Sequence, residues 1–140
     1  MDLIDRHGAE VLEKGFYSEQ EAINFIAENV SSAPLETMAV ITLTEGEAFY
    51  VHRRLKDALG VLQFDVENRL DLLHRNSRNF KKGLTVTTFY LAKGLEFDRV
   101  YVLFPASGGD KDDPLVNQAL YIAATRAMHE LCVLRYKDES

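Results

Sequence analysis

Residues 99–104 form a nearly continuous apolar run, and this run constrains the fold more than any other part of the chain. Such a run is typical of a β-strand that other layers cover on both faces, as in a parallel sheet flanked by helices. A chain of 140 residues is long enough to form one domain of this kind with its own core.

The segments around this run alternate between strand and helix patterns. Capping boxes at residues 18–21 and 44–47 each precede an apolar stripe at helical spacing, and Gly60 is expected to end the second helix. Asp113 followed by Pro114 predicts the start of a third helix. Strands are predicted at residues 38–43, 84–89 and 131–135, with 61–64 as a further short candidate.

These elements predict an α/β fold of three layers around a mainly parallel sheet. A single domain is expected over residues 1–140, in which residues 1–17 form an N-terminal extension. Residues 61–82 are otherwise expected to be a polar, basic connection.

The charge of the chain bears on its partners. The net charge is −6, which argues against tight binding of nucleic acid by the isolated chain, because that affinity comes mainly from neutralised phosphates. Residues 51–82 are the exception, with 8 basic and 4 acidic side chains. This basic region is either a solvated face or a contact with a nucleic-acid backbone.

Several classes of protein are excluded. No apolar run approaches the roughly 20 residues that span a bilayer, and the acidic, polar N-terminus does not resemble a signal peptide. The single Cys132 has no partner for an internal disulfide, so we expect a buried thiol in a reducing cytoplasm. The four histidines share no metal-ligand spacing with one another or with Cys132, so no metal site is expected.

Two short segments carry candidate chemistry. In residues 87–98, Lys93 and Gly94 place a cation beside a residue that lets backbone approach a ligand, and Glu96 can accept hydrogen bonds from a sugar hydroxyl. Because ligands bind at the carboxyl ends of strands in open parallel sheets, we expect this loop at that edge. A solvent-exposed turn with a Lys–Glu pair is the alternative.

The second segment, residues 120–127, places Arg126 after a run of small residues late in a helix. An Arg at the edge of a packed helix face can reach across a cleft to a γ-phosphate and stabilise charge during phosphoryl transfer. The alternative is a helix-terminal Arg that offsets the helix dipole.

Taken together, the two segments resemble known motifs. Residues 92–97, Ala-Lys-Gly-Leu-Glu-Phe, resemble motif V of the UvrD/Rep-type superfamily 1 DNA helicases, and residues 121–127 resemble motif VI. The chain is therefore identified as similar to their C-terminal RecA-like (2A) domain. Because no long insertion separates residues 60 and 83, it looks closest to the helicase IV-like branch, in which the 2B subdomain is absent or reduced.

The resemblance implies a composite ATP site. ATP with Mg²⁺ would be held mainly by the 1A domain of the same protein, and Arg126 would be the arginine finger. Glu96 would hold the ribose, Gly94 would permit that approach, and Lys93 would face the nucleotide cleft or the partner domain. The residues that would support Arg126 are Tyr121 and Thr125, and those that would touch single-stranded DNA are Thr88 and Tyr90.

Two positions depart from the family pattern. Tyr90 stands where the family commonly has His, and Leu43 aligns with a motif IV cation that reaches phosphate. The chain also lacks a G-x-x-x-x-G-K-[ST] sequence, so it should not hydrolyse ATP alone.

The sequence therefore predicts the C-terminal motor domain of an ATP-dependent DNA helicase or translocase. The alternative is a free-standing, non-catalytic 2A-like module, such as an inactive relic or an adaptor that binds RNA polymerase. A P-loop encoded in frame upstream of Met1 would favour the motor.

Overall fold

The computed structural model describes residues 10–33, 37–73, 83–106 and 113–137. Within these residues six strands form one sheet in the order β1-β6-β5-β2-β4-β3, and every pair is parallel. The strands are β1 (Glu10–Phe16), β2 (Met38–Thr42), β3 (Leu70–Leu72), β4 (Leu84–Thr88), β5 (Phe97–Pro105) and β6 (Ala127–Tyr136). The predicted α/β class and parallel sheet are confirmed.

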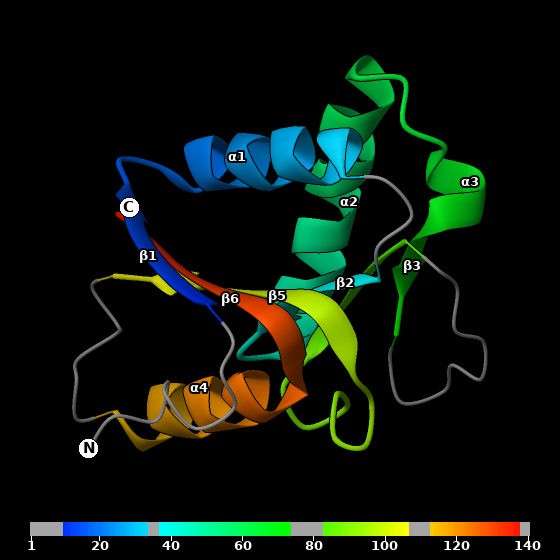
Figure 1. The fold of residues 1–140 in the computed structure, drawn as a ribbon. Coiled ribbons are helices and arrows are strands. Elements are labelled where there is room, and N and C mark those ends of the chain that lie inside the picture. Colours follow the sequence, from blue (N-terminus) through cyan, green and yellow to red (C-terminus); the bar gives the residue numbers. More distant parts are fainter. Residues whose placement is uncertain (1–9, 34–36, 74–82, 107–112, 138–140) are drawn as a thin grey trace.

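Helices cover both faces of this sheet, as the apolar strand pattern predicted (Figure 1). One face carries α1 (Glu19–Ser32) and α2 (Glu45–Val61), whose buried side chains pack with Tyr101, Cys132 and other residues of the strands. The opposite face carries α4 (Pro114–Arg126), which packs on alternate residues of the same strands. No helix within the described residues is long and apolar enough to cross a membrane.

The helix starts follow from their capping residues. The Ser18 hydroxyl accepts a hydrogen bond from the Glu21 backbone N–H, and Thr44 and Glu47 form a full capping box. Asp113 accepts from the Leu115 backbone N–H at 2.9 Å, with Pro114 as the first helical residue. All three predicted helices are confirmed.

Two predictions near the end of α2 are wrong. Gly60 does not end the helix, which continues to Val61. Residues 61–64 form no strand, because the backbone N–H groups of Leu62 and Gln63 bond back to Leu59 and Gly60, and Gln63 turns the chain with a φ of 63°.

Three elements were missed. The connection of residues 61–82 contains a short helix, α3 (Val66–Arg69), and strand β3. Residues 10–16 of the expected extension form β1, which pairs in parallel with β6. Most side chains of β1 are exposed, so the segment lacks the alternation that marks a half-buried strand. Residues 1–9 and 74–82 lie outside the described part.

Gly83 sets the start of β4. Its φ is +127°, and an added Cβ would lie 2.3 Å from the Arg69 carbonyl oxygen. Its own carbonyl accepts a hydrogen bond from the Met38 N–H at 2.7 Å, beside the first residue pair of β2 and β4. Only glycine combines this conformation with so close a backbone contact.

Candidate functional site

Residues 89–96, between β4 and β5, run across one face of the sheet, from the edge formed by the carboxyl ends of the strands to the edge formed by their amino ends. The segment leaves the carboxyl end of β4 with Phe89, whose N–H donates to the Thr42 carbonyl at 3.3 Å. Ala92 then bonds back to Thr88 at 3.2 Å, and Leu95 bonds back to Ala92 at 3.1 Å. Phe89 and Ala92 are buried in the same cluster as α4, so the segment lies on the α4 face of the sheet.

This path places Lys93, Gly94 and Glu96 at the surface, where all three are exposed. Gly94 has a φ of +85°, but nothing lies within 4 Å of the position that a Cβ would occupy. The glycine is therefore needed for its backbone conformation, and the space beside it is open to a ligand.

Arg126 is the last residue of α4, as predicted, and its guanidinium folds back onto the crossing segment. Its Nε donates to the Thr125 hydroxyl at 3.2 Å, and Nη1 donates to the Leu95 carbonyl at 3.2 Å. The Thr125 hydroxyl in turn donates to the Ile122 carbonyl at 2.7 Å. These three bonds hold the side chain in one place, while the remaining N–H groups of Arg126 have no partner among the described residues.

The two predicted motifs meet at one edge of the sheet. Phe97 of β5 is paired with Ala127 of β6, so Glu96 and Arg126, which directly precede them, lie at neighbouring strand starts. This edge is the amino-terminal one, so the expected position at the carboxyl ends of the strands is wrong for Glu96. The reason is the crossing of residues 89–96, which carries the chain from one edge to the other.

The remaining site residues are spread more widely. Tyr121 is 42% exposed on α4, and Thr125 is partly buried beside Arg126. Tyr90 is 39% exposed near the carboxyl end of β4, and its ring meets Phe89 edge-on at 5.5 Å. Thr88 has no exposed surface, so a contact with nucleic acid would require its neighbours to move.

A polar cluster beside Glu96 was not predicted. The Asp98 carboxylate accepts from the backbone N–H of Thr37 at 3.0 Å and from its hydroxyl at 3.2 Å. The same carboxylate lies 3.6 Å from Nε2 of the exposed His129. These contacts tie the start of β5 to the segments before β2 and within β6. The sequence carried no signal for them, because Thr37 lies 61 residues away from Asp98.

Other candidate groups are part of the scaffold. Leu43 packs against the cluster under α4, so the motif IV alignment places an apolar packing residue there. Burial raises the pKa of Cys132 to about 12 and that of Tyr101 to about 12, so both are protonated at neutral pH. In the described ranges, no three His, Cys, Asp or Glu side chains are grouped to hold a metal ion.

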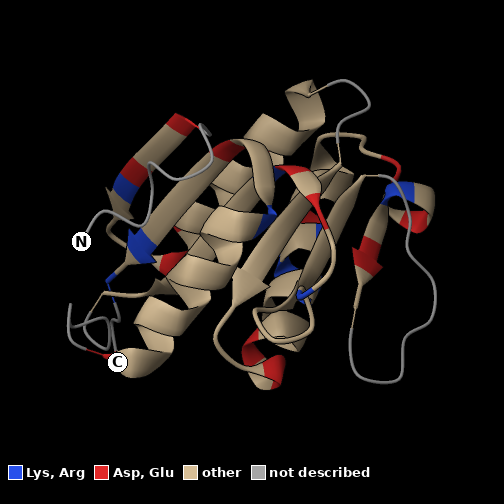
Figure 2. Ribbon diagram, turned by 60° about the horizontal axis from the view of Figure 1, so that its bottom comes forward, with Lys and Arg blue, Asp and Glu red and all other residues tan. Residues whose placement is uncertain are grey.

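The charged residues that the structure describes do not gather into one nucleic-acid-binding surface. Acidic and basic segments are interspersed along the described elements (Figure 2). Of the basic region predicted at residues 51–82, Arg54 and Arg69 are engaged with Tyr50 and Phe64, respectively, and residues 74–82 lie outside the described part.

Comparisons with known proteins bear on the fold and on the segment that holds the two motifs. Residues 83–134, which contain both motifs, match the family of UvrD-like helicase C-terminal domains. The fold is similar to the crystal structure of the C-terminal domain of a possible DNA helicase from Lactobacillus plantarum WCFS1. That match has a TM-score of 0.67 and 22% identity, and covers 94% of this chain and 76% of the other. It confirms the predicted RecA-like fold. No curated protein sequence matches the chain.

Proposed function

We propose that this chain, whose residues 83–134 match the family of UvrD-like helicase C-terminal domains, supplies one half of an ATP site in a helicase motor. The observation that carries the proposal is the meeting of Arg126 and Glu96 at the amino edge of β5 and β6. A guanidinium with unused donors suits a phosphate, and an exposed carboxylate suits ribose hydroxyls.

The residues present fit a nucleotide bound from outside the domain. Arg126 is anchored by Leu95 and Thr125, yet keeps N–H groups that can turn to a phosphate on a facing surface. The open space beside Gly94 lets such a surface approach the backbone. Lys93 adds an exposed cation on the same segment.

ATP with Mg²⁺ would be held mainly by the N-terminal helicase domain, since this chain has no P-loop. When bound, the nucleotide would supply the phosphoryl group, and Arg126 would stabilise the charge that develops on it. Tyr121 and Thr125 would hold α4 and the Arg126 side chain in position. The isolated chain is expected to show no ATP turnover.

Single-stranded DNA is the proposed track of the assembled motor. Tyr90 offers an exposed ring on which a base can stack, worth roughly 1–3 kcal/mol where such stacking occurs. Thr88 would contribute only after local rearrangement, because it is buried. The net charge of −6 implies weak, salt-sensitive binding by this domain alone.

The test joins this chain to its N-terminal helicase domain and compares Arg126→Ala with Arg126→Lys. We expect Arg126→Ala to lower kcat by roughly 10³-fold or more while nucleotide binding is largely retained. Arg126→Lys should rescue little, because an ammonium cannot reproduce the planar fork. Arg135→Ala, which removes a partly exposed Arg paired with Glu13, is the control. Normal turnover of Arg126→Ala would refute the assignment.

A further inference from the structure

A groove of about 390 Å³ lies between α1 and α2, on the opposite side of the sheet from Arg126. One wall is a stripe of α1 that includes Asn24, Ala27 and Glu28. The other is a stripe of α2 that includes Asp57, Ala58 and Val61. In both stripes the residues recur at helical spacing, so each helix presents one continuous side to the groove.

The groove exposes apolar surface that the domain itself does not cover. Val61 is 82% exposed and Leu62 is 42% exposed, and both line the groove. The small side chains of Ala27, which is buried, and Ala58, which is partly buried, also line the groove. Exposed Val and Leu side chains gain free energy when a partner covers them.

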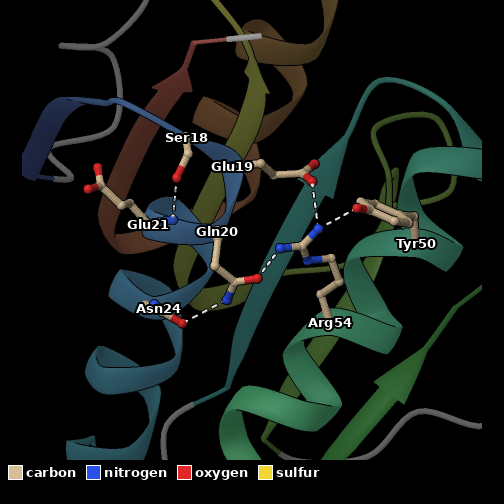
Figure 3. Close-up of polar contacts among 7 residues, drawn as sticks. All are labelled: Ser18, Glu19, Gln20, Glu21, Asn24, Tyr50 and Arg54. Carbon is tan, nitrogen blue, oxygen red and sulfur yellow. Dashed lines mark hydrogen bonds and ion pairs between the residues drawn. The ribbon is translucent and has the colours of Figure 1, made fainter. Parts of the chain in front are cut away.

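At the polar end of the groove, Arg54 already has hydrogen-bond and ion-pair partners within the domain. Arg54 of α2 donates to the Gln20 amide oxygen and to the Tyr50 hydroxyl, and lies 3.8 Å from a Glu19 carboxylate oxygen (Figure 3). These contacts join α1 to α2 and neutralise the one cation of the lining. Arg54 is therefore not available to bind an anion.

Two carboxylates that line the groove have no side-chain partner among the described residues. Glu28 on α1 and Asp57 on α2 take part in no side-chain hydrogen bond or ion pair within the described residues. They lie on opposite walls and give the groove an acidic character beside its apolar surface. Phosphate would be repelled here, whereas a Lys or Arg next to an apolar side chain would be attracted.

We propose that this α1–α2 groove binds a short amphipathic helix of another protein, with a leucine-type side chain that packs against Val61, Leu62 and Ala58. Basic residues one helical turn away would pair with Glu28 and Asp57. A groove between two helices suits this helix-in-groove mode of recognition. Because α1 and α2 lie on the opposite face of the sheet from α4, which ends at Arg126, the interaction goes beyond the proposed ATPase role and does not depend on it (Figure 1).

The test uses the chain itself and two synthetic 15-residue peptides. One carries Leu at helical spacing with Lys on the flanking positions, and the other has Glu in place of every Lys. Methyl NMR titration should show the Lys peptide shifting the resonances of Ala27, Ala58, Val61 and Leu62. Its affinity should exceed that of the Glu peptide at least tenfold.

A double charge reversal, Glu28→Lys with Asp57→Lys, should invert this preference, and the neutral pair Glu28→Gln with Asp57→Asn should abolish it. Glu10→Lys, a charge reversal of an exposed residue on β1, should change either affinity less than twofold. Retained dispersion of the NMR spectrum checks that each variant is folded. If the double charge reversal does not fold, the neutral pair alone tests the role of the two carboxylates.

Three outcomes would overturn the proposal. The first is equal affinity for the two peptides, or shifts located outside the groove. The second is concentration-dependent self-association that perturbs the same methyl groups, which would make a second copy the occupant. The third is a shift of these resonances by single-stranded oligothymidine, which would make the groove part of a nucleic-acid track.

Discussion

The two faces of the sheet are built differently. The α1–α2 face carries two helices over a cluster of large side chains that includes Tyr101 and Cys132. The α4 face carries one helix with a small-residue face, including Ala119 and Ala123, and the crossing segment 89–96 takes the place of a second helix. The turns of a segment that crosses a face can carry exposed residues. The buried side of a packed helix cannot.

The same contrast appears in one arginine from each face. Arg54 is tied to Gln20, Tyr50 and Glu19 and joins two helices. Arg126 is held by Leu95 and Thr125 but keeps unused donors at the edge of the sheet. Arg54 therefore belongs to the scaffold, whereas Arg126 keeps the unused N–H donors that a ligand contact requires.

Replacing Gly83 with Ala tests the scaffold that both faces share, and should have the largest effect on stability. The added Cβ would meet the Arg69 carbonyl at 2.3 Å in a conformation that alanine resists. We expect a loss of about 3 kcal/mol in the free energy of unfolding, measured by urea denaturation. Gly60→Ala, in open space within α2, should instead stabilise by about 0.5–1 kcal/mol. Equal effects of the two substitutions would contradict this account.

Thr125→Val tests whether the α4 face positions Arg126. The change removes the hydroxyl that accepts from Arg126 Nε and donates to Ile122, but keeps the shape. In the protein that contains both motor domains, kcat should fall roughly tenfold. Thr125→Ser, which keeps the hydroxyl, should restore most of it. If Val and Ser behave alike, the hydroxyl does not position Arg126.

Arg54→Ala and Arg126→Ala should differ in their effect on the free energy of unfolding of the isolated domain. Arg54→Ala is expected to lower the free energy of unfolding by about 1 kcal/mol, because it breaks several contacts between α1 and α2. Arg126→Ala should cost less than about 0.5 kcal/mol. The measurement is chemical denaturation of both variants, and a larger cost for Arg126→Ala would reverse the contrast.

Alkaline pH should weaken the α1–α2 face. The folded pKa values of Cys132 and Tyr101, each about 12, lie above their ordinary values of 9.0 and 10.0. A raised folded pKa gives stability that is complete below the ordinary value and is lost as pH rises toward the folded value. At pH 9.5 the loss from Cys132 should be about 1 kcal/mol. Cys132→Ala should remove most of this pH dependence, and an unchanged slope would argue against a buried thiol.

Local sequence determined a large part of this protein. The helix starts at Ser18, Thr44 and Asp113 follow from side chains that bond to backbone within three residues. The central strands follow from apolar runs that can only be buried. The motif residues Arg126 and Glu96 were also visible, and whether they act on a nucleotide remains a prediction.

Tertiary structure decided the rest, because it depends on contacts between distant residues. Strand β1 forms by pairing with β6, which lies more than a hundred positions away in the sequence. Most of its side chains are exposed, so its sequence has no pattern that predicts a strand. The edge at which Arg126 and Glu96 meet depends on residues 89–96 crossing the sheet, which required burial of Phe89 and Ala92 under α4. Sequence spacing could name the two side chains, but only packing could bring them to the same edge.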